Sequence, residues 1–280
     1  MSLLTSRPEV MDAPKIRGSQ MPGAVSRRTF TRRQKIVVTI ANLALFCLLW
    51  EALTRVFDMP SLLVPRFSAV AAELPEMIED GVLWTNAAIS LKMYFIGMAI
   101  SIVLAIPMGL VIGGVKWIDR ILSPYVWALY TLPRLILMPF VLLWVGINDA
   151  ARITLIVLSA VPAILVVVME GVKTTDASLL RVARSFGARR LDAVRTVVLP
   201  SMVPHIATGV RMGVSRGLLG LFIGELFTAS SGIGFVMVTA SRQFDSARVY
   251  LILFLFIGFS VALVGLTQWL ESRASRWRTG

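Results

Sequence analysis

The chain has 280 residues, of which 56% are hydrophobic and only 16% are charged, whereas about 25% of residues are charged in an average soluble domain. This composition excludes a soluble globular enzyme and a disordered polar protein, and it is typical of a protein with several membrane-spanning helices. The net charge of +12 would suggest nucleic-acid binding in a soluble domain. In a membrane protein a basic excess is expected in the cytoplasmic loops, so we expect membrane lipid around this chain and no nucleic-acid partner.

The N-terminal segment differs in composition from the rest of the chain. Residues 1–35 contain three prolines and eight Lys or Arg against two acids, which predicts a disordered basic tail. No small-residue cleavage site follows the first apolar segment, so we interpret that segment as a retained membrane anchor. We expect a cytoplasmic tail over residues 1–35, a transmembrane domain over residues 36–275 and a short cytoplasmic end over residues 276–280.

The apolar segments predict an all-α membrane protein with about six spans, because a helix needs about 20 mostly apolar residues to cross the hydrocarbon core. In chain order the candidates are Ile36–Phe57, Met93–Val115, Ile121–Ile147, Ile153–Met169, Ser201–Phe227 and Val249–Leu270. The third candidate is interrupted by three prolines and an arginine, and the fifth is rich in glycine and contains charges. No internal repeat and no separate soluble domain is visible in the sequence.

The loops between these spans differ sharply in their basic residues. One set of alternate segments holds 19 Lys and Arg, and the other holds only 4. The first set comprises residues 1–35, 116–120, 170–199 and 271–280, and the second comprises residues 58–86, 148–152 and 228–248. The positive-inside rule therefore predicts cytoplasmic termini, a cytoplasmic loop over residues 170–199 and an acidic, partly helical outer segment over residues 58–86.

The glycines of the fifth span share one narrow face of the predicted helix. At 100° per residue, an arc of 80° contains Gly209, Gly213, Gly217, Gly220 and Gly224. Glycine is normally unfavourable inside a helix, so this register favours a packing role. We expect another helix to approach closely along this face.

Four charged residues of the third and fifth spans are candidates for a substrate pathway: Arg134, Arg211, Arg216 and Glu225. Charges inside a membrane need partners or a watery cavity. On the fifth span Arg211 and Glu225 lie opposite the glycines, and Arg216 lies near them. Arg211 and Glu225 are fourteen residues apart, about 21 Å along the helix, so they cannot pair with each other. A pathway lined by these residues and a purely structural Arg–Glu pairing inside the protein remain equal alternatives.

The residues needed for catalysis and cofactor binding are missing from the sequence. His205 is the only histidine and Cys47 the only cysteine, which excludes a metal site rich in these residues. The chain has no G-x-x-x-x-G-K-[ST] phosphate loop. The Gly232-Ile233-Gly234 run lacks a third glycine and is interpreted as a turn. We therefore expect a non-catalytic chain without a cofactor of its own.

The loop over residues 170–199 has the pattern of two short helices. Thr174-Thr175-Asp176 offers helix N-caps. At helical spacing there follow Leu179, Leu180, Ala183 and Phe186, and Gly187 stands where a left-handed C-terminal cap is expected. A second helical stretch, Ala188–Val198, is expected to end at Leu199-Pro200. This loop is either a helix lying on the bilayer surface or a docking element for a cytoplasmic partner.

The spacing within this loop resembles the signature of binding-protein-dependent ABC transporter permeases. That signature is Glu-Ala-Ala, three residues, Gly, nine residues and Ile-x-Leu-Pro. Here Ala183, Gly187 and Val197-Val198-Leu199-Pro200 keep the spacing, whereas Arg181-Val182 replace Glu-Ala. Further stretches are similar to the nitrate, sulfonate and taurine branch of these permeases: Leu132-Pro133 through Pro139 to Trp144-Val145-Gly146, Thr208-Gly209-Val210-Arg211, Gly224-Glu225-Leu226 and Ser230-Ser231-Gly232-Ile233-Gly234.

The resemblance implies a subunit of an ATP-driven importer in the bacterial inner membrane. Such permeases work as a pair, so a second copy of this chain is an expected partner. Two cytoplasmic ATPase subunits, which hold ATP and Mg, and an extracytoplasmic substrate-binding protein are the others. The resemblance also implies that the loop helix docks in a cleft of the ATPase, with Leu179, Leu180, Ala183, Phe186, Gly187, Leu199 and Pro200 as its coupling residues. The three arginines of the spans favour a small anion such as a sulfonate, taurine or nitrate. The alternative is a secondary transporter or channel that works without an ATPase.

Overall fold

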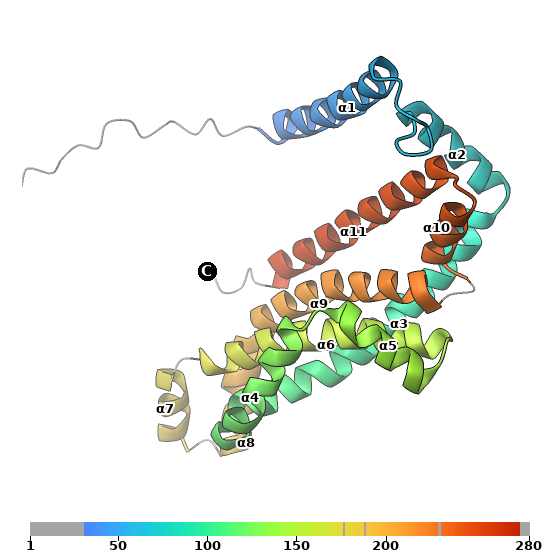
Figure 1. Ribbon diagram of the computed structural model, residues 1–280. Coiled ribbons are helices and arrows are strands. Elements are labelled where there is room, and N and C mark those ends of the chain that lie inside the picture. The colour runs from blue at the N-terminus through green and yellow to red at the C-terminus, as the bar shows by residue number, and fades with distance from the viewer. Residues whose placement is uncertain (1–30, 176, 188, 229–230, 275–280) are drawn as a thin grey trace, which may run out of the picture. The chain divides into compact units, whose positions relative to one another are not determined.

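The computed structural model describes residues 31–175, 177–187, 189–228 and 231–274 (Figure 1). Every secondary-structure element in these ranges is a helix, which confirms the predicted all-α class. The predicted basic tail lies almost wholly outside the described residues, as does the C-terminal end from residue 275, so both remain predictions. The first helix, α1 (Arg32–Val56), begins in a compact unit that ends at Leu48. Thr31 and Gln34 cap it reciprocally through side chain and backbone.

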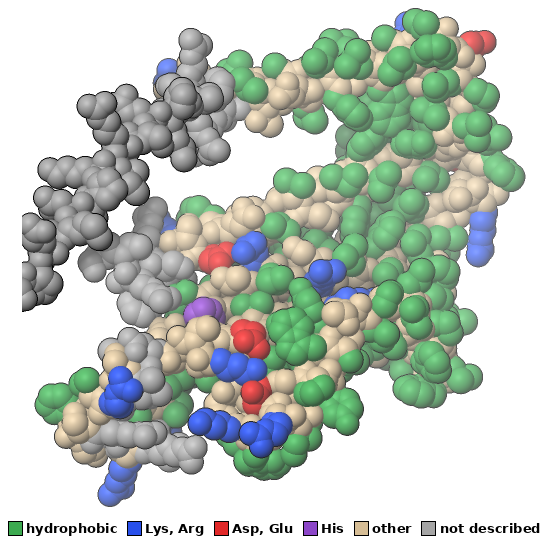
Figure 2. All heavy atoms as spheres, turned by 60° about the vertical axis from the view of Figure 1, so that its left-hand side comes forward, with side chains coloured by type: hydrophobic (Ala, Val, Ile, Leu, Met, Phe, Trp, Pro, Cys, Tyr) green, Lys and Arg blue, Asp and Glu red, His purple; other side chains and the backbone are tan. Residues whose placement is uncertain are grey.

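Within the ranges that the structure describes, five helices are long and apolar enough to cross a membrane. They are α1, α3 (Val82–Gly114), α6 (Asp149–Lys173), α9 (Leu199–Thr228), which with the preceding turn spans residues 194–228, and α11 (Ser246–Ala274). Many large hydrophobic side chains of these helices are exposed, and Figure 2 shows hydrophobic side chains over much of one face, with charged side chains gathered toward its middle and lower left.

The predicted third span is broken in the middle. It consists of α4 (Lys116–Thr131) and α5 (Arg134–Val145), which meet at an angle of 99°. Leu132 and Pro133 form the break with extended backbone angles, because a proline disfavours helical geometry in the residue before it. The expected number of about six spans is reached when this bent pair counts as one.

The start of α3 and the segment after α9 differ from the sequence prediction. Helix α3 begins at Val82 and not near Met93, so it has 33 residues and includes Lys92, which is exposed. The outer segment before it contains the helix α2 (Phe67–Glu79), as predicted, and the segment after α9 contains α10 (Ile233–Arg242), which was not expected.

Helix α6 forms the centre of the unit from Leu49 onward. It packs mainly against α9 on one side and α3 on the other. Most of its side chains are buried, among them Leu155, Ile156, Ile164 and Met169. A helix that is hydrophobic all round belongs in a protein interior, so α6 is the element against which α3, α4, α5 and α9 pack.

The loop between α6 and α9 contains α7 (Ala177–Ser185), α8 (Arg190–Ala193) and a π-helical turn (Val194–Val198). The prediction that the second helical stretch ends at Leu199-Pro200 is wrong, because the π turn continues directly into α9. Pro200 lies at this junction, where its missing backbone N–H removes one hydrogen bond from the helix.

Candidate functional site

The glycine face of α9 lies against α6. All five glycines of this face are buried. A Cβ atom added to Gly220 would lie 2.5 Å from the carbonyl oxygen of Leu155, and one added to Gly213 would lie 2.5 Å from Cγ1 of Ile164. The two helices therefore approach so closely that side chains are excluded between them.

Arg211 has a charged partner that the sequence did not indicate. Its Nε lies 2.6 Å from Oε2 of Glu271, near the end of α11, and Thr208 donates a hydrogen bond to the other oxygen of this carboxylate. Arg211 therefore has a carboxylate of the protein itself as its partner. The structure agrees with the alternative of an Arg–Glu pair inside the protein. The glutamate that pairs with Arg211 is Glu271, because Glu225 is too far away along the helix.

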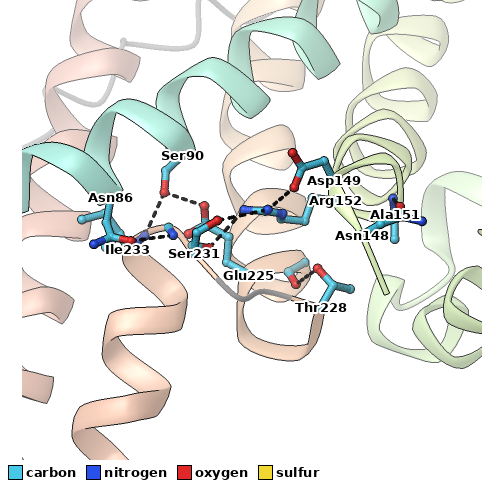
Figure 3. A network of polar contacts seen from close by, with 12 residues as sticks. Asn86, Ser90, Asn148, Asp149, Ala151, Arg152, Glu225, Thr228, Ser231 and Ile233 are labelled. Atoms are coloured by element: carbon cyan, nitrogen blue, oxygen red, sulfur yellow. Dashed lines mark hydrogen bonds and ion pairs between the residues drawn. The ribbon is translucent and has the colours of Figure 1, made fainter. Parts of the chain in front are cut away.

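Glu225 lies at the centre of a polar network at the other end of α9 (Figure 3). Only 2% of the residue is exposed. Its carboxylate accepts hydrogen bonds from the Ser90 hydroxyl of α3 and, at 2.8 Å, from the backbone N–H of Gly234. Ser90 also accepts from the N–H of Ile233, and Asn86 of α3 accepts from that of Gly232. Glu225 thus fixes the start of α10 onto α3.

Arg152 extends this network to α6. It is 2% exposed and lies in the first helical turn, which Asn148 caps. Its guanidinium pairs with Asp149, donates to the carbonyl oxygen of Ser231 at 3.1 Å and lies within electrostatic range of Glu225 (Figure 3). Helices α3, α6, α9 and α10 therefore meet at one cluster of polar and charged groups.

Sequence reasoning missed most of this network. Asn86 and Ser90 were placed in or near an outer loop, because α3 was expected to begin later. Arg152 was counted as a loop cation. A usable signal was present, since Asn148-Asp149 is a typical helix N-cap followed by an acid, which places Arg152 inside the span.

Arg134 and Arg216 lie together at the break between α4 and α5. Their guanidinium groups are within electrostatic range of each other, and α5 packs against α9. The Cζ atom of Arg216 lies 5.9 Å from the ring centroid of Tyr130, in the last turn of α4, a cation–π distance. Of the four charged pathway candidates, the structure thus brings these two together and places Arg211 and Glu225 elsewhere.

The predicted coupling residues lie at the exposed end of α7 and at the start of α9. The side chain of Phe186 is 87% exposed, and its backbone N–H closes the last turn of α7 on Val182. Gly187 has φ +78°, the left-handed conformation expected of a glycine after a helix. Ala183 is half-buried, whereas Leu199 and Pro200 are exposed. The side chains of Leu179 and Leu180, and all of Asp176, lie outside the described residues.

Nothing in this arrangement resembles a cofactor site. Within the ranges that the structure describes, no group of three or more His, Cys, Asp or Glu side chains could hold a metal ion. The arrangement is instead that of a helical membrane protein with a broken span, charges inside its helices and a helical loop at one end.

A match to a known protein family covers most of these helices. Residues 82–276 match the model of the family described as binding-protein-dependent transport system inner membrane component. The chain belongs to this family of ABC transporter permeases. The matched range includes α3 to α11 and the loop with α7, which carries the signature. The permease is thus a multi-pass protein of the inner membrane.

Sequence similarity to other permeases places the permease in the nitrate, sulfonate and taurine branch. It is 28% identical to the taurine transport system permease protein TauC of Escherichia coli, over 78% of this chain and 81% of the relative. It is 31% identical to the putative aliphatic sulfonates transport permease protein SsuC of Escherichia coli, over 81% of this chain and 87% of the relative.

A solved structure shares the fold. An inward-facing structure of the MetNI methionine ABC transporter superposes with a TM-score of 0.60 and 21% sequence identity, covering 71% of this chain and 96% of that one. At this identity the likeness concerns the fold alone.

Proposed function

We propose that this permease forms the membrane pathway of an ATP-driven importer for small sulfonates such as taurine. Its similarity to permeases of taurine and aliphatic sulfonate transport systems supports this substrate class. Arginines inside the membrane-spanning helices fit an anionic cargo. ATP hydrolysis belongs to a partner, because the chain has no phosphate loop.

The single observation that carries the proposed coupling is the exposure of Phe186. A large aromatic side chain at the tip of a polar loop helix, with a glycine stop directly behind it, is well suited to fill an apolar cleft of a partner protein. We propose that α7 docks in an ATPase subunit through Phe186 and Leu179, and that Leu180, Ala183, Gly187, Leu199 and Pro200 shape the docking loop.

The complete transporter is proposed to contain a second copy of this chain, two ATPase subunits and an extracytoplasmic substrate-binding protein. The 19-to-4 distribution of basic residues supports cytoplasmic termini and a cytoplasmic α7. The exposed apolar side chains of Phe140, Leu143 and Trp144 on α5 offer surface for the second copy.

A substitution at the docking position tests the coupling. Phe186→Asp places a charge in the proposed cleft, so we expect the permease to fold and insert while the ATPase no longer co-purifies. Phe244→Asp is the matched control, because Phe244 is 74% exposed in the turn after α10 and outside the loop. Normal co-purification of the ATPase with Phe186→Asp would exclude the docking assignment.

Thiol labelling tests the orientation. A cysteine at the exposed Ser241 of α10 should react with an impermeant reagent in intact cells, whereas a cysteine at the exposed Ser185 of α7 should react only after the membrane is opened. The reverse pattern would place α7 on the outer side and remove the ATPase from reach.

The rival function is a secondary transporter or channel. It predicts that purified permease moves sulfonates across a vesicle membrane without an ATPase. The proposed function predicts uptake only when ATP, the ATPase and the binding protein are all present.

A further inference from the structure

The break between α4 and α5 has an unusual electrostatic composition. Arg216, in the middle of α9, lies 5.9 Å from the ring centroid of Tyr130, four residues before Arg134 at the start of α5, and the charges of the two arginines act on each other. Two like charges in a membrane-spanning region repel each other and each requires desolvation. A site of this kind is stable only when something else supplies negative charge.

The structure shows no such charge from the protein. No ion pair joins Arg134 or Arg216 to a carboxylate in the described part of the chain, whereas Arg152, Arg211 and Arg248 each have one. Arg216 instead has the face of Tyr130 as its neighbour. The aromatic ring stabilises a cation without neutralising it.

Arg134 also has unused hydrogen-bond donors. Its Nη1 donates to the carbonyl oxygen of Leu132 at 3.2 Å, but its Nε and Nη2 are buried without any partner. Buried polar atoms of side chains are normally hydrogen-bonded, and an unpaired donor of a charged group is costly. Arg152 has one such atom, Nε, but Asp149 neutralises its charge.

The backbone adds positive potential at the same place. Helix α5 has 12 residues and begins with Arg134 directly after the break. The positive end of its dipole and its free N–H groups therefore lie beside Arg134, and discontinuous membrane helices use this end to hold anionic groups.

We propose that Arg134, Arg216 and the N-terminus of α5 form a transient binding site for the sulfonate group of the substrate as it crosses the membrane. This inference rests on the proposed function. Sulfonate has three oxygen acceptors and one negative charge, so the two unpaired nitrogens of Arg134 and the Arg216 guanidinium can bind it through charge-assisted hydrogen bonds. The site recognises the anionic group alone, so sulfonates with and without an amine pass equally.

Uptake measurements on the complete transporter test this site. Permease, ATPase and binding protein are reconstituted in vesicles, and the probes are taurine and ethanesulfonate. We expect Arg134→Gln and Arg216→Gln each to lower uptake of every probe that the binding protein accepts by about tenfold or more, while ATP hydrolysis stimulated by the loaded binding protein persists. Arg242→Gln, an exposed residue at the end of α10, removes the same charge and should leave uptake unchanged.

Conservative variants separate binding from folding. Arg134→Lys and Arg216→Lys keep the charge and should retain clearly more uptake than the glutamine variants, at an unchanged melting temperature. Equal losses in the lysine and glutamine variants would contradict an electrostatic site. Full uptake by either glutamine variant would overturn the proposal outright.

Chemical rescue gives an independent readout. In a Cys47→Ser background, which removes the only native cysteine, Arg216→Cys is treated with a thiol reagent that adds an aminoethyl group or with one that adds a methyl group. The charged adduct should restore uptake and the neutral adduct should not, whereas equal uptake with both adducts would exclude the site. If the unmodified transporter moves no sulfonate at all, the proposed function fails, and normal uptake with unaffected variants refutes the site alone.

Discussion

Five charged residues of the membrane-spanning helices fall into two groups. In the first group, Arg152 pairs with Asp149, Arg211 pairs with Glu271, and Glu225 is buried, accepts two hydrogen bonds and lies near Arg152. In the second group, Arg134 and Arg216 have no carboxylate among the described residues, and Arg134 keeps two buried donors unpaired. The protein supplies the counter-charges of the first group, whereas those of the second must come from outside.

Under the proposed binding site, this difference separates charges that stabilise the fold from charges that bind substrate. A charge whose partner lies on a neighbouring helix fixes the distance between the two helices. A charge without a built-in partner costs stability and is tolerated only where a ligand provides the partner. The first group should therefore respond to substitution in stability, and the second in transport.

The largest expected effect is at Glu225. Glu225→Ala leaves Ser90 and the Gly234 N–H without their acceptor and removes negative charge near Arg152, so we expect a loss of about 3–5 kcal/mol in the free energy of unfolding. Glu225→Gln keeps one carbonyl oxygen and should lose less. Thermal unfolding of the purified permease measures both. An alanine variant as stable as the parent would remove Glu225 from the first group.

The close contact of α9 with α6 gives the next largest effect. Gly220→Ala adds a Cβ that would lie 2.5 Å from the carbonyl oxygen of Leu155, so we expect a loss of about 1–3 kcal/mol from overpacking. Gly258→Ala in α11 is the control, because no atom lies within 4 Å of the added Cβ. The control should gain up to about 1 kcal/mol from better helix propensity, and equal effects at the two sites would contradict the packing described here.

The smallest effect concerns Arg211 and Glu271. The pair is partly exposed, so a double-mutant cycle with alanine should give a coupling energy of about 0.5–1 kcal/mol. Unfolding in the detergent SDS supplies the four free energies. If Arg211→Ala abolishes transport and leaves stability unchanged, Arg211 belongs with Arg134 and Arg216, and the division into two groups fails at this residue.

Patterns within short stretches of the sequence predicted those parts of the structure that depend on residues close together in the chain. The spacing of the glycines in α9 predicts which face of this helix packs closely against another helix. The position of Gly187 directly after α7 predicts a left-handed backbone conformation at this residue. The amphipathic spacing of the loop and the acidic helix α2 are likewise properties of a few consecutive residues. For this reason the all-helical class and the number of spans were predictable.

Contacts between distant segments were not predictable. Glu271 comes 60 residues after Arg211, and nothing in the local pattern of either helix indicates the other. The start of α3 was misplaced because Asn86, Ser90 and Lys92 make its first turns polar. Two of these residues are polar because they bind the start of α10, a segment far away in the sequence.

The continuity of the π turn with α9 has a mechanical consequence. Together they form an uninterrupted helical segment of 35 residues, about 50 Å long at 1.5 Å per residue, whereas the hydrocarbon core is only about 30 Å thick. The helical segment is therefore longer than the hydrocarbon core, and part of it extends beyond the membrane. A displacement of its loop end is carried toward Glu225 by this one helix, and the π turn, Pro200 and Pro204 are the places near the loop end where the helix can bend.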